Sequence, residues 1–182
     1  MITSRETFEW MKVIMIALVL AFLLRQFFFA PIVVDGQSMM PTLGDRDRMI
    51  VNKIGYTVDS PDRFDIIVFH AEVDKDYIKR IIGLPGDHIA YRNDTLYING
   101  EPFDEPYLDA YKEEAAFLPL TIDFELEDVS LYDRVPPGHY FVMGDNRQYS
   151  KDSRHIDVVE ESEIVGQANV IFWPVDELRV VN

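Results

Sequence analysis

Ser38 and Lys79 are the two residues of this chain whose types and surroundings could support covalent catalysis. Ser38 lies two residues after Gly36 in a short segment of turn-forming residues, and Lys79 interrupts an apolar stretch rich in isoleucine. Burial favours the neutral form of a lysine, and a neutral lysine can accept the proton of a serine hydroxyl. The pair could therefore supply a nucleophile and its general base.

Each of the two residues also has a purely structural explanation. A lone serine after glycine is typical of a turn, and a lysine on an edge strand faces water and discourages aggregation. In a strand, residues 77, 79 and 81 share one face and residues 78, 80 and 82 share the other. Either Lys79 or Arg80 must then point toward packed surface. These segments alone leave both interpretations open.

The composition excludes several other kinds of site. The chain has no cysteine, so a thiolate nucleophile and a cysteine-ligated metal are impossible. It contains no glycine-rich nucleotide-binding motif. We therefore expect neither a metal nor any other cofactor. The four histidines show no spacing typical of a catalytic triad or a zinc site; they are His70, His88, His139 and His155.

Size and charge narrow the class of protein further. The 182 residues include 17 Lys and Arg against 32 Asp and Glu, a formal net charge of −15. This excess of negative charge opposes binding to a phosphate backbone, so we expect no nucleic-acid partner. Apolar residues make up 48% of the chain, which is enough for one domain with a hydrophobic core and one short appendage.

The appendage is the N-terminal segment. Every residue from 13 to 24 is apolar, and the apolar run resumes at residues 27–30. Residues 8–30 reach the ~20 residues that a helix needs to cross a bilayer. We therefore predict a single transmembrane anchor within residues 1–30, in contact with membrane lipid. A cleaved signal peptide and a buried core helix are the alternatives, but no small-x-small cleavage site follows the run and the run has no polar face.

Residues 31–182 have the pattern of a separate β-rich domain. Short apolar runs are separated by turn residues, and Asn99-Gly100 is a strong signal for a two-residue hairpin turn. An acidic run at residues 123–128 is typical of a solvated face or loop. The sequence therefore predicts a mainly β fold with antiparallel pairing. The predicted strands are residues 49–52, 64–70, 77–82, 88–91, 95–98, 140–143 and 165–173.

Three ordered segments resemble the motifs of the type I signal peptidases, particularly the compact form of Gram-positive bacteria. Gly-Gln-Ser-Met-Met-Pro-Thr at residues 36–42 is similar to the nucleophile segment of that family. Tyr-Ile-Lys-Arg at 77–80, with Gly-Leu-Pro-Gly-Asp at 83–87, is similar to its general-base segment. Residues 144–154 resemble its closing motif, and the resemblance extends from the apolar segment to the C-terminus.

The resemblance implies a membrane-anchored serine endopeptidase. A single transmembrane helix would precede an antiparallel, barrel-like catalytic domain on the extracytoplasmic side of the cell membrane. Ser38 would attack the scissile carbonyl and Lys79 would take its proton, which is a triad variant without histidine. The substrates would be preproteins that carry signal peptides, and no cofactor or metal would take part.

The resemblance also implies supporting roles for residues of the third motif. Ser150 would hold the lysine amine in place, with Ser153 as the alternative, because this role needs a short side chain that both donates and accepts hydrogen bonds. The other supporting residues would form an ion pair or brace the loop: Asp152 with Arg154, and Asp145 with Asn146.

Two further features concern the substrate. By motif position, Val34 and Ile78 would line a shallow groove in which the substrate adds as an extended strand. In the Gram-negative branch of the family, the residue two before the nucleophile supplies a hydroxyl to the oxyanion hole, whereas here that residue is Gly36. We expect the Ser38 backbone N–H to be one donor, and Gly36 or a neighbouring main-chain N–H to be the second.

Two other classes of protein fit fewer of these features. A self-cleaving repressor-type protease uses a related dyad, but no DNA-binding segment precedes the motifs and an anchor would serve no purpose there. A non-catalytic surface protein on the same scaffold could bind peptides, but it would not need both Ser38 and Lys79.

Overall fold

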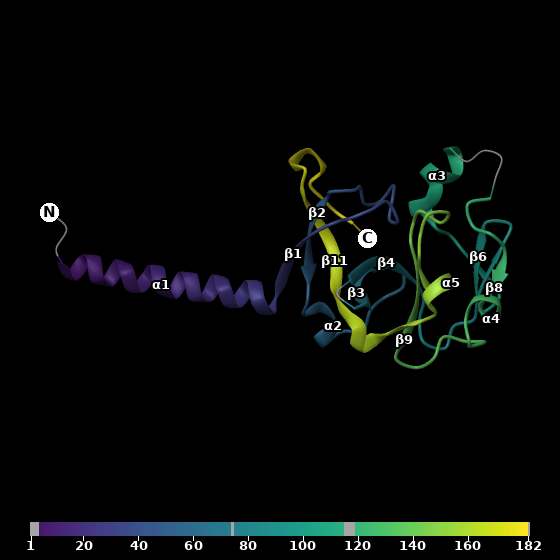
Figure 1. Cartoon of the computed structure of the whole chain (residues 1–182), viewed down its shortest axis with the longest axis horizontal. Helices are drawn as coiled ribbons and strands as arrows, with labels where there is room; N and C mark the ends of the chain where they lie inside the picture. Colours follow the sequence, from purple (N-terminus) through teal and green to yellow (C-terminus); the bar gives the residue numbers. More distant parts are fainter. Residues whose placement is uncertain (1–3, 74, 115–118, 182) are drawn as a thin grey trace.

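The computed structural model describes residues 4–73, 75–114 and 119–181. Its first element is a helix, α1 (Ser4–Phe27), which extends away from the β-rich body as a rod (Figure 1). The described side chains of this helix, residues 7–22, are all exposed, so the body does not bury them. The helix is therefore not part of the core.

The anchor predicted at residues 8–30 overlaps this helix only in part. The helix ends at Phe27, and the first strand already begins at Phe29. The side chains of residues 23–27 lie outside the described part of the chain. Within the described part, no helix combines the length and the apolar character needed to cross a membrane.

The larger of two antiparallel sheets forms the half of the body next to α1. Its strands follow the order β1-β2-β11-β3-β4-β9-β10, and β12 pairs with β11. Strand β4 therefore lies in the interior of the sheet, between β3 and β9. The strands are β1 (Phe29–Val33), β2 (Arg48–Asn52), β3 (Ile66–Glu72), β4 (Lys75–Gly83), β9 (His139–Met143), β10 (Val159–Glu160), β11 (Ile164–Trp173) and β12 (Arg179–Val180).

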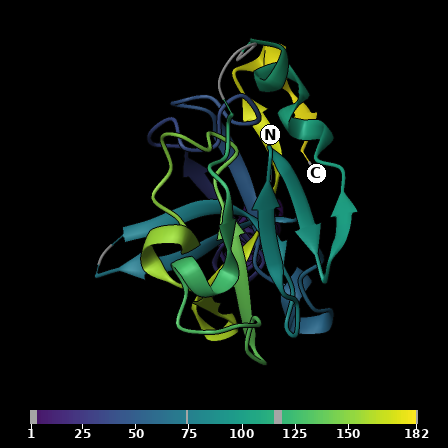
Figure 2. The same ribbon diagram turned by 90° about the vertical axis from the view of Figure 1, so that its right-hand side faces the viewer.

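The smaller sheet covers the far end of the body and has the order β7-β6-β5-β8. Figure 2 shows it nearest the viewer. Positive φ angles of 53° at Asn99 and 88° at Gly100 form the predicted hairpin turn between β6 and β7. The strands are β5 (Ile89–Arg92), β6 (Thr95–Ile98), β7 (Glu101–Phe103) and β8 (Phe124–Glu125).

Short helical segments connect the strands. The turns α2 and α5 flank the larger sheet, whereas α3 and α4 lie with the smaller one (Figure 1). The α-helices are α2 (Gly55–Val58), α3 (Asp109–Glu114), α4 (Leu126–Val129) and α5 (Ser153–Ile156), and the 3₁₀ helices are η1 (Pro106–Leu108), η2 (Glu161–Glu163) and η3 (Val175–Glu177).

The prediction of a mainly β, antiparallel fold is confirmed. Each of the seven predicted strands has a counterpart, and β1, β7, β8, β10 and β12 were not predicted. The apolar core gathers in three clusters of buried side chains. One of them joins β2, β3 and β11 to the loop that carries Ser38, so the packing of the larger sheet also fixes that loop.

Candidate active site

Ser38 lies on a turn between β1 and β2 that the core holds in place. The side chains of Val34, Met39 and Leu43 are buried at 4%, 1% and 0% exposure. The Val34 N–H donates to Asp47 O at 2.8 Å, and the Leu43 N–H donates to Met39 O at 2.9 Å. Because its neighbours are anchored on both sides, the Ser38 hydroxyl has a defined position.

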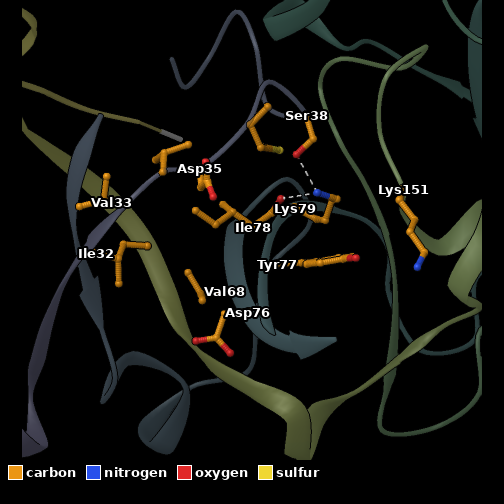
Figure 3. Close-up of a pocket in the computed structure, with 12 residues that line it drawn as sticks. Ile32, Val33, Asp35, Ser38, Val68, Asp76, Tyr77, Ile78, Lys79 and Lys151 are labelled. Atoms are coloured by element: carbon orange, nitrogen blue, oxygen red, sulfur yellow. Dashed lines mark hydrogen bonds between the residues drawn. The ribbon is translucent and has the colours of Figure 1, made fainter. Parts of the chain in front are cut away.

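Lys79 reaches this hydroxyl from the middle of β4. Its Nζ lies 2.8 Å from Ser38 Oγ and donates to Ile78 O at 2.9 Å (Figure 3). At Lys79, strand β4 pairs with β3 but not with β9, yet the Lys79 side chain is only 3% exposed. The structural alternative of a lysine that faces water on an edge strand is therefore wrong.

The surroundings of Lys79 favour its neutral form. Burial lowers the pKa of Lys79 from its usual value to about 8, although the Asp152 and Asp145 carboxylates act in the opposite direction. Burial disfavours the charged amine because the interior solvates it poorly. At neutral pH a minor fraction of the protein therefore holds an amine that can accept a proton, and this fraction rises to about half near pH 8.

Arg80 is buried as well as Lys79. The sequence required only that one of these two side chains point toward packed surface. The Arg80 side chain is fully buried on the other face of β4, where its Nε and Nη2 donate to the two Asp145 carboxylate oxygens at 2.9 Å each. A bidentate pair of this kind satisfies a buried charge. Both basic residues therefore point into packed surface, and each has a partner.

Asp145 and Asn146, for which a bracing role was expected, both bond to the turn that carries Ser38. Besides Arg80, Asp145 accepts a short hydrogen bond from the Thr42 hydroxyl. Asn146 donates from its backbone N–H to Ser38 O at 3.0 Å and from its side chain to Gln37 O at 3.0 Å. The loop after β9 is thus bonded directly to the turn that carries Ser38.

Asp152 and Arg154 form the predicted ion pair, with Arg154 Nη2 2.8 Å from Asp152 Oδ2. Asp152 also accepts from the Gly144 N–H at 3.0 Å. Burial acts to raise the pKa of Asp152, but the hydrogen bonds and charge of Arg154 outweigh it and hold the pKa below its usual value. Asp152 therefore stays ionised and fixes the loop behind Lys79.

The hydrogen bond expected between Ser150 and Lys79 is absent from the described residues. Ser150 is 7% exposed, and its Oγ has no hydrogen-bond partner in the described part of the chain. It faces the Asp152 carboxylate closely enough to help lower the pKa of that group, but not in hydrogen-bond geometry. The alternative residue, Ser153, accepts a hydrogen bond from the Val142 N–H at 2.9 Å, so its hydroxyl binds the backbone of β9.

The oxyanion donor expected at Gly36 is already occupied, because the Gly36 N–H donates to Asp45 Oδ1 at 2.9 Å. Gly36 has a φ of +100°, which an L-residue rarely adopts. The Ser38 N–H has no acceptor among the described residues. Of the two groups named from the sequence, only the Ser38 N–H is therefore free to bind an oxyanion.

A cavity of about 350 Å³ opens beside Ser38 and Lys79. Val34 and Ile78, the two residues expected to line a substrate groove, both line this cavity. Figure 3 shows Ile32 and Val33 on one side and Tyr77 on the other. It lies between β1, which ends the sheet, and residues 76–79 of β4, which pair only with β3. Both edges could pair with an extended peptide.

A second buried cluster, not predicted from the sequence, ties the same loop to the smaller sheet. Arg147 and Glu105 are each 3% exposed and form a close ion pair. Arg147 also donates to the Tyr91 hydroxyl at 2.7 Å, and the Tyr107 hydroxyl donates to Glu105 at 2.7 Å. Arg147 lies within the third motif, at residues 144–154. The residues around Glu105 gave no indication that Glu105 is buried.

The cluster contacts Arg80, the residue that follows Lys79 in β4. The Tyr107 ring lies 4.0 Å from the Arg80 guanidinium, in the range of a cation–π contact. Among the described residues, no group of three or more metal-ligating side chains is present. The contact between Ser38 Oγ and Lys79 Nζ offers proton transfer and nucleophilic attack by side chains.

Comparison with known proteins identifies the class. A family model described as "Signal peptidase, peptidase S26" matches residues 7–173. The chain therefore belongs to the signal peptidases of the S26 family. It is a serine peptidase of the class that removes signal peptides from preproteins.

Individual relatives agree with this assignment. Signal peptidase I of Bacillus caldolyticus is 54% identical over 151 residues, covering 83% of each chain. Signal peptidase IB of Staphylococcus aureus strain Mu50 is 40% identical over 180 residues, covering 97% of this chain and 94% of the relative. The crystal structure of a signal peptidase I from Enterococcus faecalis V583 is 42% identical, with a TM-score of 0.57 over 60% of this chain and 97% of that one.

Proposed function

We propose that this protein is a membrane-anchored signal peptidase in which Ser38 is the nucleophile and Lys79 the general base. The observation that carries the proposal is the 2.8 Å distance between Ser38 Oγ and the buried Lys79 Nζ, beside a cavity of about 350 Å³ that Val34 and Ile78 line. Nucleophile and base lie within the reach that proton transfer requires.

The reaction proceeds in two halves. Neutral Lys79 takes the Ser38 hydroxyl proton while Oγ attacks the scissile carbonyl carbon, which gives a tetrahedral intermediate. The carbon–nitrogen bond then breaks, and the Lys79 ammonium returns its proton to the leaving amine. In the second half, water gives a proton to Lys79 and attacks the Ser38 ester. The acid product leaves, and the proton returns to Ser38.

The oxyanion that forms on the carbonyl needs hydrogen-bond donors. The Ser38 N–H supplies one, and a main-chain N–H other than that of Gly36 supplies the second. Each such donor stabilises a transition state of this type by about 3 kcal/mol.

The peptide before the cut occupies the cavity beside Ser38 as an extended strand between β1 and the first half of β4. Side chains of an extended peptide alternate between two faces. The residues that face Val34 and Ile78 must be small, because these two side chains form the walls. This arrangement selects small residues at the first and third positions before the cut.

The helix α1 serves as the single membrane anchor, with the catalytic domain on the extracytoplasmic side. A nucleophile held at the bilayer surface meets the cleavage site of a membrane-inserted signal peptide in a local search. Such tethering raises the effective concentration of the substrate without any added contact.

The direct test uses the full chain in detergent with a purified preprotein. We expect release of a mature protein whose new N-terminus, determined by mass spectrometry, follows a small-x-small sequence. Binding of the preprotein without cleavage would favour a non-catalytic peptide-binding protein. Cleavage of the chain itself, with the preprotein left intact, would favour a self-processing protease.

The pKa of Lys79 sets the expected pH dependence. Because the amine must be neutral to act as a base, kcat/KM should fall about tenfold for each pH unit below 8 and level off above it. Initial rates between pH 6 and 10, with a peptide substrate that does not titrate in this range, measure the profile. An optimum below pH 7 would indicate a carboxylate base instead.

The variant Ser150→Ala tests whether the Ser150 hydroxyl supports the Lys79 amine. A buried hydroxyl without a partner costs free energy, so Ser150→Ala should not lower the free energy of unfolding. If Ser150 turns to accept from Lys79 when the amine becomes charged, the same change should lower kcat by about tenfold or more. Urea denaturation and peptide cleavage measure the two effects.

Ser153→Ala is the matched control for this variant. It leaves the buried Val142 N–H without its acceptor, so it should cost about 1–3 kcal/mol of stability. An unchanged kcat in Ser150→Ala would remove Ser150 from the mechanism.

A further inference from the structure

A second cavity, also of about 350 Å³, borders the turn that carries the nucleophile. Gln37 and Met40 line this cavity, whereas Ser38 and Met39, which lie between them in the chain, line the first. The two cavities are therefore separated by a single turn of backbone, and Ser38 lies at their boundary.

The walls of the second cavity suit an uncharged stretch of polypeptide. Met40, Leu120 and Tyr149 offer apolar surface, and Gln37 and Gln148 offer side-chain amides that can bond a peptide backbone. The charged group in its lining is the Arg147 guanidinium, which the buried Glu105 carboxylate already pairs. Among the residues that the structure describes, the lining of this cavity thus has no unpaired charge with which to select a charged side chain.

This cavity is fixed to the catalytic turn, and one of its walls is accessible. Asn146, which also lines it, bonds both Ser38 O and Gln37 O. Gln148 donates to Pro119 O at 3.3 Å, which joins the loop to a separate segment. Tyr149 is 77% exposed, so its ring is accessible to a bound peptide.

The reaction itself requires a place for the second half of the substrate. An endopeptidase substrate continues beyond the scissile bond, and the half before the bond fills the first cavity in the proposed function. An extended peptide advances about 3.3 Å per residue. The scissile bond lies at Ser38. Counted from this bond, the second and third residues after the cut are therefore far enough along the peptide to reach the cavity lined by Gln37 and Met40.

We propose that the second cavity binds the start of the mature protein and favours apolar side chains at the second and third residues after the cut. This inference rests on the proposed function and extends it, because it makes cleavage depend on the mature sequence as well as on the signal peptide. Tyr149 is the main contact, and it covers the apolar side chains once they are bound.

The test compares two peptides with the full chain in detergent. The peptides share one signal-peptide segment and cleavage site and differ only at the second and third residues after the cut, Phe-Leu in one and Gly-Gly in the other. For the wild-type protein we expect kcat/KM to be about tenfold higher for the Phe-Leu peptide, as for truncation of a central aromatic contact. In Tyr149→Ala this ratio should fall to about twofold or less.

Tyr132→Ala is the control, because Tyr132 is also an exposed tyrosine and lines neither cavity. It should keep the wild-type ratio. A ratio near one in the wild-type protein, or the same ratio in Tyr149→Ala as in the wild type, would overturn the assignment. Failure of the proposed function would differ from either result, because the wild-type protein would then cleave neither peptide.

Discussion

Replacement of Lys79 by Arg or Met is expected to lower kcat for preprotein cleavage by about four orders of magnitude, as is replacement of Ser38 by Ala. Ser38→Ala removes the attacking oxygen. Lys79→Arg keeps a charge but not a base, because guanidinium does not lose its proton in a protein. Lys79→Met removes the amine and keeps an apolar side chain of similar length in a buried site.

These variants have a matched control on the same strand. Lys75, at the exposed start of β4, pairs with Glu72 at the surface, so Lys75→Arg should leave kcat unchanged. Thermal unfolding of each variant separates loss of activity from loss of fold. Near-normal cleavage by a folded Lys79→Met protein would show that another group acts as the base.

Asp145→Ala is expected to lower the free energy of unfolding by about 3–5 kcal/mol, because it leaves a buried charge without its partner. Both side chains of the Arg80–Asp145 pair are fully buried. The change also removes the acceptor of the Thr42 hydroxyl, so the turn that carries Ser38 should lose a support and kcat should fall. Urea denaturation of the full chain in detergent, followed by circular dichroism, measures the stability.

Two further variants make this second prediction specific. Asp133 is exposed, and Asp133→Ala should change the stability by less than about 0.5 kcal/mol. The double variant Arg80→Met, Asp145→Leu removes both charges and should recover part of the lost stability, because an apolar pair can replace a buried ion pair, while the Thr42 hydroxyl still lacks its acceptor. If the double variant were no more stable than Asp145→Ala, the unpaired charge would not be the cause of the loss.

The sequence predicted those strands that are long enough to show a pattern. Strands such as β4 and β11 carry runs of apolar residues bounded by turns, whereas β8, β10 and β12 have two residues each and show no period. Strand β1 was hidden for a different reason. Its first residues continue the apolar run of α1, so residues 29 and 30 were assigned to the anchor.

The sequence also identified the residues that lie at the site, but not all of their contacts. Ser38, Lys79, Val34 and Ile78 line one cavity, and motif position was enough to group them. The burial of Glu105 was not predictable from its surroundings, because its partner Arg147 is 42 residues away in the chain. A carboxylate in an acidic region is usually solvated, and only the fold brings this one to a buried guanidinium.

The short connection between α1 and β1 has a consequence for how far from the bilayer the enzyme can cut. The helix ends at Phe27, and β1 runs from Phe29 to Val33, where it reaches the wall of the cavity. Five extended residues span about 17 Å. With α1 in the membrane, as proposed, the length of β1 fixes the distance between the bilayer surface and the cavity beside Ser38. Preproteins would then be sorted by the spacing between their apolar segment and their cleavage site, independently of the residues that fill that spacing.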